Sequence, residues 1–267
     1  MNCIVTAGPT FEPLDDVRRL TNFSTGRLGT ELANFLAARG HKVTLLIGVA
    51  STWPGERKAQ SVKTFSTTAD LCAKLKAFSK KKVDVIFHAA AVGDFAFGEI
   101  FTETKAGEFA ALKAAKKFST RQGHLLAELV PTPKIIAELR GWFPKTKIVG
   151  WKFEADGRRA DALRSAEKQI ADCAVDFCVA NGPAYGKGFN LVSGRGRKHF
   201  AGMAGLFTAL ERLQVEGCRL EKFTRRKLAA FNLQPSPVML QNSSVVSAPL
   251  LSAPSRRRGT APQTPRD

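Results

Sequence analysis

Short apolar runs alternate with helix-periodic segments through most of the 267-residue chain, and this alternation constrains the fold more than any other feature. Such a repeat is typical of a parallel sheet covered by helices on both faces. The sequence therefore predicts an α/β, Rossmann-like fold with a mostly parallel sheet. The expected strands cover residues 2–6, 42–47, 83–88, 125–130, 147–151 and 176–180. The expected helices cover residues 26–39, 69–80, 133–141 and 158–172, and short strands at 189–192 and 198–200 precede a helix at 203–213.

Two regions break the regular pattern. About twenty residues separate the first expected strand from the first helix, which is far more than a usual βα connection. Residues 95–123, rich in Lys, Ala and Thr, are expected to be irregular. Long ordered loops at the carboxyl ends of parallel strands are where such folds bind ligands. We therefore expect both regions to build the site or to close over it.

The character of the chain changes after residue 221. Residues 222–267 hold six of the 13 prolines, many serines and the run Arg256-Arg257-Arg258, with little periodicity. This composition predicts a disordered, basic, Pro/Ser-rich tail that follows a folded domain over residues 1–221. A functional alternative is that the tail contacts RNA or a membrane.

The distribution of charge matters more than its total. The formal net charge is +18, which by itself suggests nucleic acid as a partner. However, +7 of this charge belongs to residues 222–267, and the remaining +11 is spread over 221 residues. That moderate excess also suits an enzyme with phosphorylated, anionic substrates, so nucleic acid is not the expected main partner.

The cysteine pattern and the hydropathy of the chain indicate the cellular compartment in which it is expected. The five cysteines are widely spaced with no C-x-x-C, which fits buried free thiols in a reducing cytoplasm. The sequence begins directly with an expected strand and shows no signal-peptide pattern. Its apolar runs are too short to span a bilayer. We expect a cytoplasmic protein with no membrane partner.

The stretch T-N-F-S-T-G-R-L-G at residues 21–29 opens the first expected helix. A helix N-terminus carries unpaired N–H groups and a partial positive charge, so it attracts phosphate. Ser24 and Thr25 offer hydroxyl donors, Gly26 allows close approach of the backbone, and Arg27 adds a charged donor. The alternative interpretation is that these residues only cap the helix.

A dehydrogenase is the competing interpretation of such a pattern. The G-x-G-x-x-G fingerprint does not follow the first strand, where the chain reads Ala7-Gly8-Pro9-Thr10. The single tyrosine, Tyr185, has Phe189 four residues on, so a Tyr/Lys catalytic pair is missing. A nucleotide-binding oxidoreductase or flavoprotein remains the alternative function.

The stretch H-A-A-A-V-G-D-F at residues 88–95 ends another expected strand. The small residues Ala89 and Ala90 allow a base or ribose to lie against the backbone. Asp94 could bind hydroxyls or a metal, although Asp also caps turns. His88 could act as a base, but a hydrogen-bonded structural histidine is the simpler interpretation.

Lysines are frequent in the irregular region. Lys105, Lys113, Lys116 and Lys117 are all candidates to close over a polyphosphate, and their spacing does not choose among them. A solvated basic loop is the alternative.

Taken together, these segments resemble phosphopantothenoylcysteine synthetase, also called phosphopantothenate–cysteine ligase, which in many bacteria is the C-terminal half of a bifunctional decarboxylase/synthetase. The similar stretches occur in the order of that family. They are V-T-A-G-P-T-F-E-P-L-D-D-V-R (5–18), L-T-N-F-S-T-G-R-L-G (20–29), A-A-A-V-G-D-F (89–95), K-F-S-T (117–120), L-V-P-T-P-K-I-I (129–136), V-G-W-K-F-E (149–154) and V-A-N-G (179–182).

The resemblance implies an enzyme of coenzyme A biosynthesis. Its substrates would be 4'-phosphopantothenate, cysteine and a nucleoside triphosphate, which is CTP in most bacteria and ATP in eukaryotes. The carboxylate attacks the α-phosphate, pyrophosphate leaves, and the amine of cysteine attacks the resulting acyl-nucleotide. We expect Mg²⁺ to accompany the nucleotide, no flavin, no metal held by the protein alone, and a homodimer formed through the α/β domain.

The resemblance also implies roles for individual residues. Asn22 would contact the acyl-nucleotide, and Lys117 would bind phosphates in the transition state. Asp94 would contact the nucleotide, and Trp151 replaces the usual phenylalanine beside the base. The other nucleotide contacts implied by the motifs are Ser24, Thr25, Gly26, Arg27, His88, Ala89, Ala90, Pro133, Lys134, Ile135 and Ile136.

Two departures from the family are visible. CTP-using enzymes often carry two lysines, four residues apart, in the helix before V-A-N, where this chain has Gln169 and Cys173. Lys168 would point about 100° away from Gln169 on an ideal helix. The choice between CTP and ATP therefore stays open, with overall likeness favouring CTP. Because Met1 lies just before the first matching strand, we also expect the decarboxylase step to come from another chain.

Overall fold

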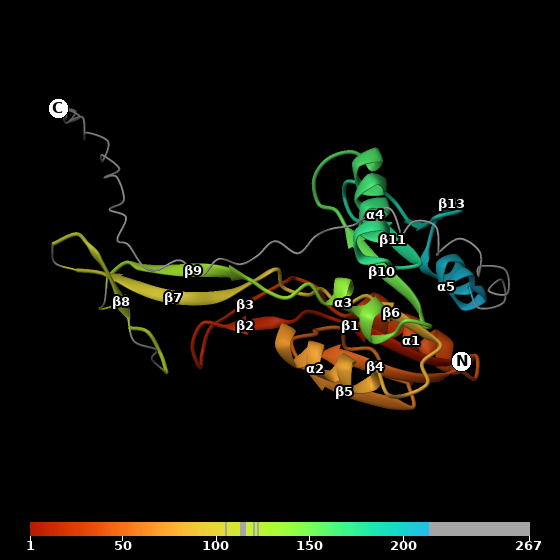
Figure 1. Ribbon diagram of the computed structural model, residues 1–267, viewed down its shortest axis with the longest axis horizontal. Coiled ribbons are helices and arrows are strands. Elements are labelled where there is room, and N and C mark those ends of the chain that lie inside the picture. Colours follow the sequence, from red (N-terminus) through yellow and green to blue (C-terminus); the bar gives the residue numbers. More distant parts are fainter. Residues whose placement is uncertain (105, 113–115, 120, 122, 214–267) are drawn as a thin grey trace, which may run out of the picture. The chain divides into compact units, whose positions relative to one another are not determined.

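The computed structural model describes residues 1–104, 106–112, 116–119, 121 and 123–213 (Figure 1). The predicted tail, residues 222–267, and two of the candidate lysines, Lys105 and Lys113, lie outside the described residues.

Within the described residues, the main sheet has eight strands in the order β13-β12-β11-β10-β6-β1-β4-β5. The strands from β11 to β5 run parallel, and β12 and β13 add an antiparallel hairpin at one edge. The predicted α/β, mostly parallel fold is confirmed. The strands are β1 (Asn2–Ala7), β4 (Lys42–Gly48), β5 (Ser61–Phe65), β6 (Val85–His88), β10 (Lys147–Phe153), β11 (Phe177–Asn181), β12 (Phe189–Ser193) and β13 (Gly196–Phe200).

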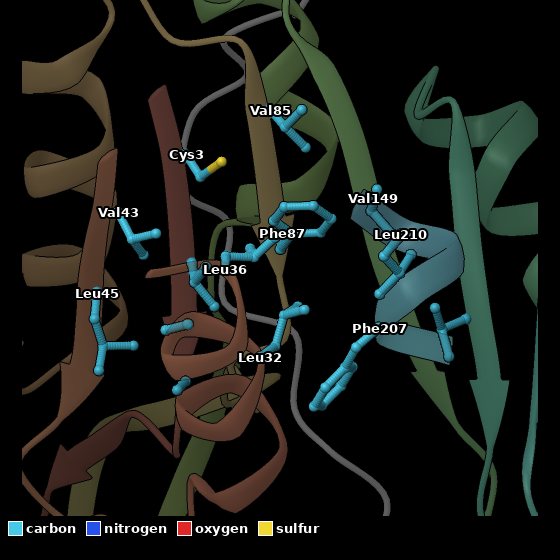
Figure 2. Close-up of a cluster of buried hydrophobic side chains, with 14 of the residues drawn as sticks. Cys3, Leu32, Leu36, Val43, Leu45, Val85, Phe87, Val149, Phe207 and Leu210 are labelled. Carbon is cyan, nitrogen blue, oxygen red and sulfur yellow. The ribbon is translucent and has the colours of Figure 1, made fainter. Parts of the chain in front are cut away.

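Helices cover both faces of this sheet, because successive residues of each strand point to opposite sides. On one face, alternate residues of β1 and β6 pack against α1 and α5, as Figure 2 shows for Leu32, Leu36, Phe87 and Phe207. On the other face, the intervening residues pack against α2 and α3. α4 covers β11 and β12. The helices are α1 (Arg27–Ala38), α2 (Thr68–Phe78), α3 (Ile135–Trp142), α4 (Arg159–Cys173) and α5 (Met203–Arg212).

The strand predicted at residues 125–130 forms, but outside the main sheet. β9 (Leu125–Pro131) pairs antiparallel with β7 (Phe95–Glu103), which also pairs with β8 (Phe109–Leu112) in a separate sheet (Figure 1). The prediction that residues 95–123 are irregular is therefore wrong for β7 and β8. These strands expose much of both faces, so their sequences lack the continuous apolar run of a buried strand.

Three shorter strands were also missed. β2 (Phe11–Pro13) and β3 (Arg19–Thr21) form a hairpin inside the long loop after β1. β5 lies at the edge of the main sheet, where Val62 is 40% exposed and only Phe65 is buried. An edge strand with one covered residue carries little hydrophobic signal.

Candidate functional site

A cavity of about 300 Å³ lies at the N-terminus of α1. It is bounded by the residue after β1 and the residue after β6, two neighbouring parallel strands. The chain leaves β1 toward β4 on one side, whereas β6 is followed in the sheet by β10 on the other, so the cavity lies at a topological switch point. Its lining residues are Gly8, Ser24, Thr25, Gly26, Arg27, Leu28, Gly29, Ala89 and Met203.

The first turn of α1 is suited to an anion. Its N-cap is Gly26, which makes no side-chain cap bond, and within the described residues the turn has no acidic residue. Thr25 Oγ1 accepts from the Arg27 N–H at 3.3 Å, and Arg27 Nε donates to Glu31 at 2.7 Å. The helix end therefore keeps its partial positive charge toward the cavity.

Three glycines bring this turn onto the end of β1. A Cβ on Gly8, whose φ is +76°, would lie 1.8 Å from Ser51 Oγ. A Cβ on Gly26 would lie 2.8 Å from the same oxygen, and one on Gly29 would lie 2.7 Å from the Ala7 Cβ. Sequence reasoning found Gly26 but used Gly8 only as a failed dinucleotide fingerprint, and it gave Ser51 and Met203 no role.

His88 is buried at the end of β6 and contacts the first strand. Its Nδ1 lies 3.0 Å from Thr6 Oγ1, which also accepts from the Ala90 N–H at 3.0 Å. Burial lowers the pKa of His88 from 6.5 to about 4, so the imidazole is neutral at neutral pH. This arrangement favours a structural histidine over a general base, and Ala89 is the member of the segment that lines the cavity.

Asn22 joins the two main motifs. Its Nδ2 donates to the carbonyl oxygens of Ala91 and Val92 at 3.2 and 3.3 Å. Thr10, missed by sequence reasoning, reinforces the junction because its Oγ1 accepts from the Gly93 N–H at 2.8 Å and its carbonyl accepts from Thr21. The side chain of Asn22 is exposed beside the A-A-V segment, as a ligand contact requires.

Asp94 and the P-T-P segment are also adjacent. The Asp94 carbonyl accepts from the Thr132 N–H at 2.9 Å, and the Asp94 side chain is exposed. Pro133 and Lys134 are exposed beside it, whereas the side chains of Ile135 and Ile136 are buried in the core. The two isoleucines therefore offer a ligand only their main chain.

Trp151 and Lys117 do not line the α1 cavity. Trp151 is half-buried on β10 against the core on the α1 face, and its Nε1 is buried without a hydrogen-bond partner among the described residues. Lys117 is exposed in a segment that contacts the loop at residues 15–18. The structure thus gathers Ser24 to Arg27 and Ala89 in one cavity, whereas Asn22 bonds to the Ala91 and Val92 carbonyls and Asp94 to Thr132, outside the cavity lining.

Neither a metal site nor a membrane span is found in the part of the chain that the structure describes. No group of three or more His, Cys, Asp or Glu there could hold a metal ion. No described helix is long and apolar enough to cross a bilayer.

Residues 1–195 match the family described as the DNA/pantothenate metabolism flavoprotein C-terminal domain. The chain belongs to this family. The coenzyme A biosynthesis bifunctional protein CoaBC of Thermococcus kodakarensis is 34% identical over 179 residues, which cover 67% of this chain and 40% of the relative. A cysteine/cysteine sulfinic acid decarboxylase from an unknown prokaryotic organism is 31% identical over 178 residues, covering 66% and 44%. The chain thus spans less than half the length of these curated relatives.

Solved structures of the family share the fold. The DNA/pantothenate metabolism flavoprotein from Streptococcus pneumoniae aligns with a TM-score of 0.69 and 24% identity, over 80% of this chain and 99% of that one. The C-terminal domain of CoaBC aligns with a TM-score of 0.61 and 20% identity, over 80% and 93%. At these identities the likeness shows the fold alone.

We predict that Gly8→Ala weakens binding of a nucleoside triphosphate about tenfold or more, because the new Cβ would displace Ser51, against which Gly26 at the start of α1 also packs. The matched control is Gly40→Ala, which has a similar φ of +79° but no atom within 4 Å of the added Cβ. Both variants should lose about 1 kcal/mol of stability from the positive φ. Isothermal titration calorimetry and urea unfolding measure the two effects, and equal affinity in both variants would contradict the role of the glycine.

We also predict a loss of stability below pH 6.5 that depends on His88. In the unfolded chain His88 takes up its proton near its ordinary pKa of 6.5, whereas in the folded chain it does so only near 4. The stabilisation is therefore fully present above pH 6.5 and is lost progressively as the pH falls to about 4, because over this range the unfolded chain binds one more proton. The pKa difference corresponds to about 3 kcal/mol over the full range. Urea unfolding at pH 7 and pH 5 should show a smaller difference for His88→Gln than for the wild type. An unchanged pH dependence in that variant would rule out His88 as the source.

Proposed function

We propose that the chain is a cytoplasmic phosphopantothenate–cysteine ligase of coenzyme A biosynthesis. The single observation that carries this proposal is the cavity at the start of α1, whose rim is joined by Asn22 to the A-A-V segment after β6. A helix N-terminus at the switch point of a parallel sheet offers a phosphate site next to a polar amide, as activation of a carboxylate by a nucleotide requires.

The relatives support the same assignment. The Thermococcus protein is named as a bifunctional protein of coenzyme A biosynthesis. A solved structure of a Cab2 mutant holds phosphopantothenate-cysteine, and it aligns with this chain at a TM-score of 0.57 and 19% identity. Because the chain spans less than half of the curated relatives, we assign it one activity and propose that the decarboxylation step belongs to another chain or domain.

The proposed reaction has two steps. A carboxylate oxygen of 4'-phosphopantothenate attacks the α-phosphorus of the nucleotide, and pyrophosphate leaves. The amine of cysteine then attacks the acyl carbon, forming the amide and releasing the nucleoside monophosphate and a proton. Neither step changes an oxidation state, so the proposed reaction needs no flavin.

Each site residue is assigned a proposed role from its position in the structure. The first turn of α1, with Ser24, Thr25 and Arg27, would bind phosphate oxygens and offset their charge. Asn22 lies where the nucleotide and the acyl group would meet. Asp94, Trp151 and the backbone of residues 133–136 would bind the nucleoside. Lys117 would approach the phosphates and stabilise the charge that develops as pyrophosphate leaves.

We propose that Mg²⁺ is bound by the phosphates of the nucleotide. The described residues do not form a metal site by themselves, and Mg²⁺ is commonly bound through substrate phosphates and water. We therefore assign no protein ligand to it.

We propose CTP as the preferred nucleotide and ATP as the alternative. The two helix positions where many CTP-using enzymes have lysines carry no cation here. Gln169 Nε2 contacts Cys178 Sγ at 3.4 Å above Gly150, and Cys173 is 3% exposed. Discrimination must then come from other residues near the base.

The direct test is to incubate the protein with phosphopantothenate, cysteine, Mg²⁺ and either CTP or ATP. Pyrophosphate and a cysteine-dependent product are expected, with CTP used faster. If neither nucleotide gives a product, the proposed function is wrong.

Lys117→Gln and Asn22→Asp should each lower kcat by about 100-fold or more while the fold stays intact, although Asn22→Asp also loses the two hydrogen bonds from Nδ2 and should melt at a lower temperature. The first removes a cation, and the second replaces an amide donor by a carboxylate close to an anionic intermediate. Lys63→Gln, at an exposed position on β5, is the matched charge control and should keep full turnover. If Lys116→Gln abolished activity and Lys117→Gln did not, the assignment of the lysine would be wrong.

We propose further that the protein is a homodimer, with the antiparallel sheet as its interface in place of the α/β domain that the resemblance implies. Phe101, Phe109 and Leu126 share one face of this sheet by cross-strand register, and Phe109 and Leu126 are 44% and 51% exposed. The opposite face, with Ile100 and Leu112, lies over Phe118 and Leu14. The same face also carries Glu103, opposite Phe109, and we propose that a second copy of the same face covers its exposed aromatic and aliphatic side chains.

Leu126→Asp should therefore convert the protein to a monomer. Val49→Asp is the control, because Val49 is 53% exposed but lies outside this sheet. Sedimentation velocity distinguishes the two states. A wild type that sediments as a monomer, or a Leu126→Asp variant that remains dimeric, would overturn the assignment.

A further inference from the structure

The loop at residues 15–18 binds a segment a hundred residues away. Asp15 Oδ1 accepts from the main-chain N–H groups of Val17 and Arg18 at 2.9 and 2.7 Å, which closes a local turn. Asp15 Oδ2 accepts from Arg18 Nε at 3.0 Å and from Arg18 Nη2 at 2.5 Å. The local turn uses only Oδ1, whereas Oδ2 and the Arg18 guanidinium, which are paired with each other, also make contacts outside the turn.

Both groups reach the main chain of Phe118. The Phe118 N–H donates to Asp15 Oδ2 at 3.2 Å, and Arg18 Nη2 donates to the Phe118 carbonyl at 2.9 Å. One residue earlier than Lys117, the Lys116 carbonyl accepts from the Asp16 N–H at 3.1 Å. Asp15 and Arg18 thus bond to both main-chain groups of Phe118, as a neighbouring strand would. Together with the bond from Asp16 to Lys116, these contacts hold the residues on both sides of Lys117 in place.

The contact is shielded from water on one side only, because the Arg18 side chain is 43% exposed. The Asp15 side chain is 0% exposed, and Phe118 is 4% exposed with its ring at a cavity of about 310 Å³ beside Leu14 and Ile100. The hydrogen bonds from Arg18 hold the pKa of Asp15 well below its ordinary range, so this carboxylate stays ionised at any pH at which the enzyme works. In contrast, Lys117 itself is exposed.

We propose that Asp15 is a positioning residue for Lys117, acting with Arg18 through the main chain of Phe118. The proposal rests on the proposed ligase function, in which Lys117 meets the phosphates. A lysine side chain is long and flexible, and fixing its backbone removes part of the freedom that must be lost to reach the transition state. Asp15 touches no reacting atom in this arrangement.

The first experiment needs no substrate. Trypsin cleaves after lysine where the backbone can open, so limited proteolysis after Lys116 and Lys117 reports how firmly the segment is bound. Asp15→Asn keeps the shape of the side chain but loses the ion pair and the acceptor for Phe118, and cleavage there should become about tenfold faster. An unchanged cleavage rate would overturn the proposed contact.

The control is Asp161→Asn. Asp161 also pairs with an arginine three residues on, Arg164, and accepts from a main-chain N–H, that of Arg158, at 2.8 Å. It lies on α4, and within the described residues its hydrogen bonds and ion pairs are with Arg158 and Arg164, not with residues 116–118. This variant should cleave after Lys116 and Lys117 at the wild-type rate, and an equal acceleration would show that general loss of stability is the cause.

The second experiment asks whether Asp15 acts through Lys117. In the wild-type background, Asp15→Asn should lower kcat about tenfold and change KM less than about twofold. In the Lys117→Gln background the same change should lower kcat less than about twofold, because the group being positioned is already gone. Equal losses in both backgrounds would overturn the proposal.

The two experiments separate the two possible failures. If the wild type forms no product, the ligase assignment fails, whereas the proteolysis comparison still decides whether Asp15 holds the segment. If the wild type is active and Asp15→Asn is as active as the wild type, the ligase assignment stands and the positioning role is wrong.

Discussion

The close approach of the first turn of α1 to the end of β1 is the contact on which the rest of the site depends. Gly29 lies over Ala7, and Gly8 and Gly26 meet around Ser51 with no room for a Cβ on either. The buried side chains Leu32 and Leu36 then fix the direction of the helix against the sheet. Because helix and strand touch at their ends, the N–H groups of α1 and the carboxyl edge of β1 and β6 border one cavity.

The main sheet was predictable because its strands are covered on both faces. β1, β4 and β10 read as continuous apolar runs, and the amphipathic pattern of α1 stops at Gly40, whose φ is +79°. The antiparallel sheet was not predictable in the same way. β9 was identified as a strand, but its partner β7 is exposed on both faces, and nothing local indicates that residues 95–103 pair with residues 125–131.

For the candidate site, too, residues with a local sequence signal were predicted and residues with distant partners were not. Ser24 to Arg27 were found because a helix start after a strand is a local signal, and the structure places them around one cavity. Thr10 and Asp15 were not found, because their importance comes from partners far along the chain, Gly93 and Phe118. Short-range pattern cannot register a hydrogen bond across a hundred residues. The binding and catalytic roles themselves remain predictions from resemblance.

The start of α1 has a further consequence for the protein in the cell. In the described part of the chain the N-cap residue Gly26 makes no side-chain cap bond and the first turn has no acidic residue, and of its N–H groups that of Arg27 donates to Thr25 Oγ1. An anion that binds there completes the helix, and by mass action every such complex withdraws molecules from the unfolded pool. If the nucleotide binds there as proposed, the folded fraction of the protein would rise with the nucleotide concentration.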